Sequence, residues 1–253
     1  MEYYGLKIVP GYPAAYHKSK RTLMVADLHL GFETEAQKEG IYLPRLQLKR
    51  ALELIEKLSA LLDVYVLIVN GDLKQSFEKL TLQEREEVAR FLAEAKDRIP
   101  RVVLVRGNHD NYVSIITSRF DVPIVEKYEL SSDILLVHGH KIESKDLSYK
   151  LLVIGHEHPA FKLFDELGSI AKLPCFLHVP LVNGNSCFVL PAAGYYQTGN
   201  PITLNRMEYL SPVLRDYSII EEAVPIVFEH EKETIEFPPL KALDALLQTS
   251  VEQ

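Results

Sequence analysis

The 253 residues of the chain are 47% hydrophobic and 25% charged, a composition that is typical of a globular protein and excludes a disordered or fibrous chain. The net charge of −7 argues against a protein that coats nucleic acid with a uniformly basic surface, although a local basic strip stays compatible with it. Two cysteines, Cys175 and Cys187, are too few for a disulfide framework. We therefore expect buried thiols in a reducing compartment.

The N-terminal sequence lacks the basic start and apolar stretch of a secretory signal. No run approaches the ~18 apolar residues that a membrane span needs, so we expect a cytoplasmic protein without membrane contact. No linker-like composition interrupts the chain, and we expect a single domain over residues 1–253. The sequence leaves open the role of the part beyond about residue 215 and the oligomeric state.

Five short apolar runs predict buried strands, because each is rich in Val, Ile and Leu and ends at a Gly or a polar cluster. These runs are Thr22–Ala26, Val64–Val69, Val102–Val105, Ile134–Val137 and Leu151–Ile154. Apolar residues at helical spacing over 48–62 predict one helix between the early strands. A capping box at Thr81–Glu84, followed by apolar positions to Ala95, predicts another. The first ~120 residues therefore indicate a βαβαβ order.

After about Ile124, short strands and turns replace the helical patterns. The apolar runs at 176–179 and 188–190 flank Asn183-Gly184-Asn185, which predicts a hairpin. An amphipathic stretch over 240–247 predicts a final helix. Together these elements predict an α/β protein with a mixed sheet.

Polar residues follow each of the five predicted strands directly. The five motifs are Asp27-Leu28-His29, Asn70-Gly71-Asp72, Gly107-Asn108-His109-Asp110, His138-Gly139-His140 and Gly155-His156-Glu157-His158. In α/β sheets, ligand sites gather at the carboxyl ends of the strands, so we expect these motifs to form one crowded site.

Carboxylates and imidazoles packed together would repel one another and would be costly to desolvate, and a cation removes that cost. Mixed nitrogen and oxygen ligands suit borderline divalent ions better than calcium or magnesium alone. Seven candidate ligands are too many for one tetrahedral ion and suit two ions that share a carboxylate, the usual arrangement for displacement at phosphorus. We expect two divalent ions, manganese first, with iron, zinc or nickel as alternatives.

The five ordered motifs resemble those of the calcineurin-like metallophosphoesterase superfamily. More narrowly, several segments are similar to the branch of ligase-associated DNA-damage-response endonucleases. They are 26–31, 71–74, 155–160, 174–176, 190–192 and 198–199, and they extend the similarity to about residue 214. His138-Gly139-His140 also resembles the wider small bacterial phosphodiesterases of the superfamily. The resemblance implies a four-layer αββα sandwich with metals on loops at one sheet edge.

The resemblance also implies a role for each motif. The first metal would take Asp27, His29, Asp72 and His158, and the second would take Asp72, Asn108, His138 and His156, with Asp72 bridging. A hydroxide held between the metals would attack phosphorus in line. His109 would bind no metal and would stabilise or protonate the leaving oxygen, while Asp27 or Asp110 would orient its imidazole. Asp110 is also a candidate catalytic residue, although support of a neighbouring ligand is the favoured role for it.

Three further residues are candidate contacts to a substrate phosphate: His140, which belongs to the fourth motif, and Arg106 and Lys74, which flank motifs. For His140 the alternatives are a partner of a metal ligand or an inert loop residue, and for the two cations a solvated surface charge. Glu157 is expected to face solvent. Tyr195 and Tyr196 are expected to pack a strand or to stack on a base.

The leading hypothesis is a phosphodiesterase, possible nuclease activity included, acting on a phosphoester substrate such as a nucleotide or single-stranded nucleic acid. Long non-specific contact with duplex DNA is disfavoured, because such binding depends on many Lys and Arg contacts to phosphates. The alternatives are a phosphomonoesterase with the same site, or a catalytically silent metal-binding scaffold on the same fold.

Overall fold

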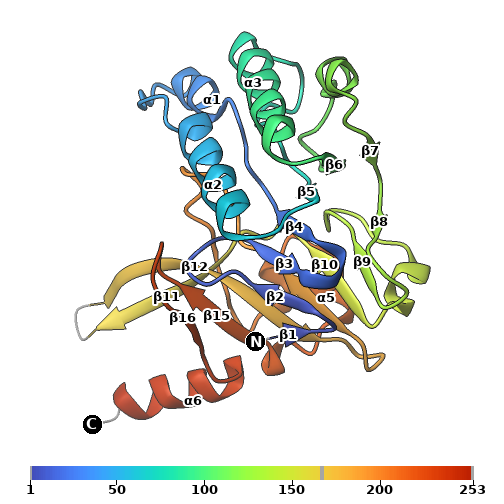
Figure 1. The fold of residues 1–253 in the computed structure, drawn as a ribbon. Coiled ribbons are helices and arrows are strands. Elements are labelled where there is room, and N and C mark those ends of the chain that lie inside the picture. The colour runs from blue at the N-terminus through green and yellow to red at the C-terminus, as the bar shows by residue number, and fades with distance from the viewer. Residues whose placement is uncertain (1, 166–167, 252–253) are drawn as a thin grey trace.

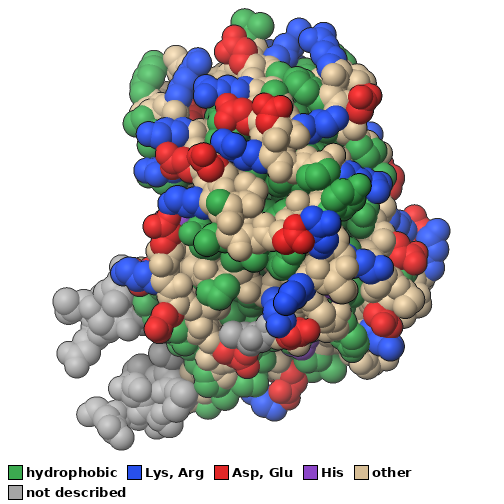
Figure 2. Space-filling model, in the orientation of Figure 1, with side chains coloured by type: hydrophobic (Ala, Val, Ile, Leu, Met, Phe, Trp, Pro, Cys, Tyr) green, Lys and Arg blue, Asp and Glu red, His purple; other side chains and the backbone are tan. Residues whose placement is uncertain are grey.

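The computed structural model describes residues 2–165 and 168–251. Two facing sheets lie between helices α1 to α3 on one side and α5 and α6 on the other (Figure 1). The four-layer αββα sandwich implied by the resemblance is thus confirmed. Lys and Arg side chains are interspersed with Asp and Glu on the face drawn in Figure 2, so this face is not uniformly basic.

Within the described residues, the first sheet holds seven strands whose order in space is the order in sequence. Strands β4 to β7 run parallel, and β1 to β4 are antiparallel neighbours. The bounds from β1 to β7 are Glu2–Tyr3, Leu6–Ile8, Ala15–His17, Thr22–Val25, Val66–Asn70, Arg101–Val105 and Ile124–Val125. The first three predicted strands are therefore β4, β5 and β6.

The second sheet has the spatial order β14-β11-β12-β13-β10-β9-β8, and β15 joins β12 and β16 beside this path. Its bounds from β8 to β16 are Tyr128–Glu129, Ile134–Leu136, Leu151–Ile154, Pro159–Asp165, Gly168–Pro180, Ser186–Val189, Asn200–Pro201, Val224–Phe228 and Thr234–Glu236. The predicted hairpin is confirmed, because β12 and β13 pair antiparallel around a turn in which Gly184 has φ +86°. Strand β15 shows that the segment beyond residue 215 contributes to this sheet.

The helices of the described chain agree with the predicted βαβαβ order. Their bounds from α1 to α6 are Phe32–Lys38, Gln47–Leu61, Leu82–Arg98, Ser114–Thr117, Pro212–Tyr217 and Leu240–Val251. Thr81 caps α3 as predicted, since its hydroxyl accepts from Glu84 N at 3.2 Å while the Glu84 carboxylate accepts from Thr81 N at 2.7 Å. None of these helices is both long and apolar enough to cross a lipid bilayer.

Three apolar clusters hold the four layers together. Phe91 of α3 and Ile55 of α2 pack on Leu67 at the outer face of the first sheet. Residues such as Ile68 and Phe188 fill the space between the sheets. A third cluster packs α5 and α6 on the second sheet and includes Cys187. Both cysteines are buried and unpaired, as expected, and burial raises the pKa of each thiol. The packed sheets therefore give the strand ends fixed positions.

Candidate metal centre

The five motifs meet at one edge of the sandwich because the loops that carry them are bonded to one another. The loop after β4 follows the loop after β5, since Asp27 N donates to Gly71 O at 3.0 Å and His29 N donates to Asp72 O at 2.9 Å. The second sheet joins them, because the Asp27 carboxylate accepts from His156 N at 3.1 Å. The strand ends of both sheets thus converge as the sequence predicted.

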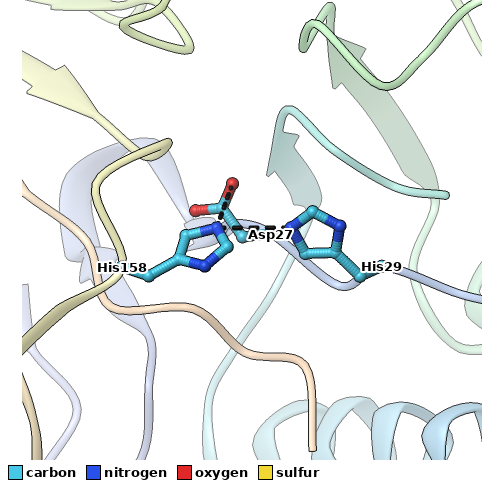
Figure 3. A group of neighbouring side chains, drawn as sticks. All are labelled: Asp27, His29 and His158. Atoms are coloured by element: carbon cyan, nitrogen blue, oxygen red, sulfur yellow. Dashed lines mark hydrogen bonds and ion pairs between the residues drawn. The ribbon is translucent and has the colours of Figure 1, made fainter. Parts of the chain in front are cut away.

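Three groups of described side chains bring ligand atoms within 4.8 Å of one another. The groups are Asp27 with His29 and His158, His29 with Asp72 and His109, and Asp72 with His138 and His156. Figure 3 shows the first group, in which the His158 ring points at both the Asp27 carboxylate and the His29 ring. His158 Nε2 lies 3.3 Å from Asp27 Oδ1 and 3.2 Å from His29 Nε2.

Asp72 lies between the other two groups. Its Oδ2 atom is 3.2 Å from His138 Nε2, 3.9 Å from His29 Nε2 and 3.8 Å from His109 Nε2. Asn108 joins the same cluster, because its Oδ1 is 3.1 Å from His138 Nε2. All seven predicted ligands therefore meet, and one carboxylate oxygen faces imidazoles of two groups.

The donor set fits divalent cations. Asp27, Asp72 and His138 are almost completely buried, and buried charges of this kind need a counter-ion. His29 Nε2 and His158 Nε2 point at each other, and His29 Nδ1 has no hydrogen-bond partner in the part of the chain that the structure describes. Imidazole nitrogen together with carboxylate and amide oxygen is the ligand mixture that manganese, iron and zinc accept.

The electrostatics agree with this donor set. Burial lowers the pKa of His29 to about 3 and that of His156 to about 4, so both rings are neutral and keep a lone pair for a metal. Burial also lowers the pKa of His138, but the Asp72 carboxylate outweighs this effect and raises the pKa to about 9. Burial raises the pKa of Asp72, yet the neighbouring histidines hold it below its usual range. A cation beside Asp72 would take the place of the proton on His138.

Five of the predicted ligands have left-handed backbone conformations, which side chains other than glycine rarely adopt. Their φ angles are +57° for Asp27, +46° for His29, +51° for Asp72, +67° for His156 and +47° for His158. Such residues each cost about 1–3 kcal/mol and persist where the surrounding structure imposes them, commonly at functional sites.

Gly71 gives a direct test of this tight packing. A Cβ atom at Gly71 would lie 2.1 Å from His138 Nδ1, and the φ of this glycine is +88°. We expect Gly71→Ala to displace the His138 ring, to lower the free energy of unfolding by at least about 3 kcal/mol and to weaken metal binding. Thermal unfolding and metal analysis of the purified variant would measure both effects.

Gly184 supplies the matched control. Its φ is +86°, and a Cβ there would meet nothing within 4 Å. Gly184→Ala should therefore lose only about 1–2 kcal/mol, from the left-handed backbone alone, and keep its metal. Equal losses in the two variants would contradict the argument that Gly71 makes room for His138.

Asp110 contacts the backbone of the ligand loops and not the His109 ring. It is fully buried, and its carboxylate accepts from Asp72 N at 3.0 Å, Leu73 N at 2.9 Å and Gly107 N at 2.8 Å. Burial, with the nearby Asp72 charge, raises its pKa to about 6. The prediction that Asp110 orients the His109 ring is therefore wrong, because both its oxygens hold the backbone of two ligand loops. These contacts agree with the alternative that Asp110 supports neighbouring ligand residues.

His109 is oriented by a group that sequence reasoning missed. Its Nδ1 donates to the carbonyl oxygen of Gln75, and the Phe77 ring packs on it with centroids 3.6 Å apart. The carboxylate of Asp27 instead faces His138 and His158. A backbone carbonyl has no residue signature, so no sequence signal could have identified the Gln75 contact.

The three predicted substrate contacts have different outcomes. Lys74 is fully buried, its Nζ donates to the Ser76 carbonyl, and burial lowers its pKa, so the prediction that it meets substrate is wrong. Arg106 Nε lies 3.0 Å from the Glu126 carboxylate. Arg106 and His140 both line a cavity of about 220 Å³ that reaches His138. These two residues therefore lie beside the cluster.

Glu157 differs from expectation, and the tyrosine pair differs from the first of its two expected roles. Glu157 is buried, not solvent-facing, and its carboxylate accepts from the backbone N–H groups of Leu210 and Ser211. This contact ties the last ligand loop to the start of α5. Tyr195 and Tyr196 lie in a turn, outside any strand.

The cluster opens into a cavity of about 350 Å³. Two of its lining side chains have a buried polar atom without a hydrogen-bond partner, namely Gln75 Oε1 and Gln197 Nε2. The other residues that line it are His29, Asp72, Phe77, Asn108, His109, His156, His158, Asn200 and Leu210. The cavity thus gives a small substrate access to His109 and to five predicted ligands, namely His29, Asp72, Asn108, His156 and His158.

One solved structure and one family profile agree with this architecture. The chain shares 22% sequence identity with the Pseudomonas putida nuclease MPE, with a TM-score of 0.62 over 90% of this chain and 94% of that one, which shows a shared fold. The protein AQ665 from Aquifex aeolicus is 20% identical, with a TM-score of 0.37 over 58% of this chain and 81% of that chain. No curated protein matches the sequence. A profile of calcineurin-like phosphoesterases matches residues 20–189, more than half of the sequence, and the chain therefore belongs to the calcineurin-like phosphoesterase family.

Proposed function

We propose that the protein is a binuclear metal-dependent phosphodiesterase that acts on nucleotides or nucleic acid. The observation that carries this proposal is the position of Asp72, whose Oδ2 atom faces His29 on one side and His138 on the other. A carboxylate between two sets of imidazoles is the arrangement that two ions sharing one ligand require. Membership of the calcineurin-like phosphoesterase family supports the reaction class.

Each ion would have ligands from both sheets. One would be held by Asp27, His29, Asp72 and His158, and the other by Asp72, Asn108, His138 and His156. Manganese is the first choice for this donor set, with iron, zinc or nickel as alternatives. When bound, the two ions supply Lewis acidity that activates water and offsets negative charge on the phosphoryl oxygens.

His109 would assist departure of the alcohol. Because its Nδ1–H donates to the Gln75 carbonyl, the ring has a fixed orientation and its Nε2 is directed at the cavity. In the imidazolium form, Nε2 also carries a proton, which it can donate to the leaving oxygen. His140 and Arg106, in the neighbouring cavity, would contact the phosphate or the second ester group.

The surroundings favour a diester over a monoester. A monoester dianion needs more compensating charge, yet Lys74 is buried away from the cavity and Arg106 is paired with Glu126. We expect kcat/KM for bis(p-nitrophenyl) phosphate to exceed that for p-nitrophenyl phosphate by about tenfold, the worth of one charge-assisted hydrogen bond. The two rates should be measured with manganese at the same pH.

This assay also separates the alternatives. A clear preference for the monoester would make the protein a phosphomonoesterase with the same metal site. Bound metal without hydrolysis of either ester would make it a silent scaffold. The fold shared with a protein described as a nuclease, and the resemblance to DNA-damage-response endonucleases, support nucleic acid as the substrate.

A further inference from the structure

A loop over residues 192–200 connects the two sides of the metal centre. At its start, Ala193 N donates to Ala26 O at 2.9 Å and Gly194 N donates to Asp27 O at 3.0 Å. At its end, Asn200 N donates to His158 O at 2.7 Å. The side chains between these anchors, from Tyr195 to Thr198, are thus fixed relative to two predicted metal ligands.

This loop forms one wall of a cavity of about 650 Å³ outside the metal centre. Gln197 lines this cavity and also the cavity that contains His109, so the two adjoin. The opposite walls come from α2, through Arg50 and Lys57, and from β12, through Lys172. The volume lies in the range of sites for small organic ligands.

Of the two lysines that line the cavity, Lys172 forms no ion pair with a described carboxylate. Lys172 Nζ donates to the carbonyl of Gly199 at 2.8 Å and approaches the Thr198 hydroxyl at 3.4 Å, and it pairs with no carboxylate in the described parts of the chain. By contrast, Arg50 is paired with Glu53 and Lys57 with Glu231. Lys172 therefore holds a fixed positive charge that an anion can use.

Tyr195 offers an aromatic surface beside this charge. Its side chain is 49% exposed, and the Arg50 guanidinium lies 5.3 Å from the ring centroid. The neighbouring Tyr196 packs edge-on against it and is itself anchored, because its hydroxyl donates to the Pro44 carbonyl at 2.6 Å. A half-exposed ring supported by an arginine is a platform on which a base can stack.

Gln197 provides the link between the two cavities. Its Nε2 atom is buried and has no hydrogen-bond partner among the described residues. An unused buried donor at a junction is suited to a phosphate or base oxygen. Lys172 suits a phosphate, Tyr195 suits a base and Gln197 lies between them and the metal centre. Together these three groups match one nucleotide that extends from the metal centre.

We propose that this cavity binds the nucleotide next to the scissile phosphate of single-stranded nucleic acid. Tyr195 stacks on the base, Lys172 binds the adjacent phosphate and Gln197 contacts the link to the reacting phosphate. An unpaired strand is required, because a base within a duplex is already stacked on its neighbours. The inference rests on the proposed phosphodiesterase function and adds a binding site for the nucleotide that adjoins the reacting phosphate.

Binding and hydrolysis of oligothymidylate test the proposal separately. Binding is measured by fluorescence anisotropy of the labelled strand with EDTA present, which prevents cleavage. We expect Tyr195→Ala to weaken binding about tenfold, the effect of losing one stacked base. Lys172→Ala should reduce the dependence of log K on log salt by about 0.7. With manganese, either variant should lose about ten times more kcat/KM on oligothymidylate than on bis(p-nitrophenyl) phosphate.

Two matched control variants lie at the opposite end of the parallel strands. Tyr65 is 48% exposed with the Arg21 guanidinium 5.5 Å from its ring, which reproduces the surroundings of Tyr195, and Lys20 is an exposed lysine of the same region. Tyr65→Ala and Lys20→Ala should bind and cleave like the parent protein.

Each outcome has a distinct meaning. Equal effects in Tyr195→Ala and Tyr65→Ala, or an oligothymidylate that does not bind, would overturn the nucleotide site. If Tyr195→Ala weakens binding as expected but neither oligothymidylate nor bis(p-nitrophenyl) phosphate is hydrolysed, the nucleotide site stands and the proposed enzymatic function fails.

Discussion

Replacement of Asp72 by asparagine is expected to reduce the metal content well below two ions per chain and to lower kcat/KM by about 10³-fold or more. The carboxylate faces His29 and His138, so the loss of its charge weakens both ion sites at once. Each ion supplies several kcal/mol of transition-state stabilisation, and about 1.4 kcal/mol corresponds to a factor of ten. Elemental analysis and hydrolysis of bis(p-nitrophenyl) phosphate would measure the two effects.

Asp146 provides the control for loss of a buried carboxylate. It is as buried as Asp72, with 2% exposure for each, but it accepts from Lys127 Nζ at 2.6 Å and from Glu143 N through its other oxygen. Asp146→Asn should lower stability without changing the number of bound ions. An Asp72→Asn protein with two ions per chain and full activity would reject the bridging role.

The sequence predicts the location of this site well because of the geometry of parallel strands. The runs that became β4, β5, β6, β9 and β10 each end at a chemically active motif, and parallel strands of a sheet end at a common edge. The motifs at the strand ends therefore predict where the site lies, and no knowledge of side-chain contacts is needed. The sequence pattern alone predicted one mixed sheet. The resemblance to the family added that two sheets face each other.

The errors concern what each polar side chain contacts. Lys74 follows Asp72 by two residues, and whether it faces substrate or the interior depends on Ser76 and Glu84, which fold back beneath it. Glu157 is buried because Leu210 and Ser211, more than fifty residues later, donate their backbone N–H groups to it just before α5 begins. Such long-range contacts leave no mark on local periodicity.

Short elements were missed for a different reason. Strands β1 to β3 have two or three residues each, which is below the length at which alternation can be recognised. Helix α1 begins after Gly31 without a capping side chain, so the usual N-terminal signal is absent. In these places the first sheet and the ligand loops impose the structure, and local propensity does not.

Replacement of His109 by alanine is expected to preserve both metal ions. It should lower the hydrolysis rate by about 10²–10⁴-fold for substrates with an alcohol leaving group. The ring is fixed by the Gln75 carbonyl and packed against Phe77, and its Nε2 is directed at the cavity. Because Nδ1 donates to the Gln75 carbonyl, a proton for the leaving oxygen must come from Nε2, which the alanine variant lacks.

The leaving group distinguishes this role from metal binding. His109 Nε2 lies 3.8 Å from Asp72 Oδ2, close enough for a third ligand group with His29, so a ligating role is the direct competitor. Proton donation matters for an alcohol such as the ribose of a dinucleotide, but hardly for p-nitrophenolate, which leaves without a proton. The His109→Ala protein should therefore lose far more rate on a dinucleotide than on bis(p-nitrophenyl) phosphate. Equal losses on both substrates, together with fewer than two ions per chain, would instead make His109 a metal ligand.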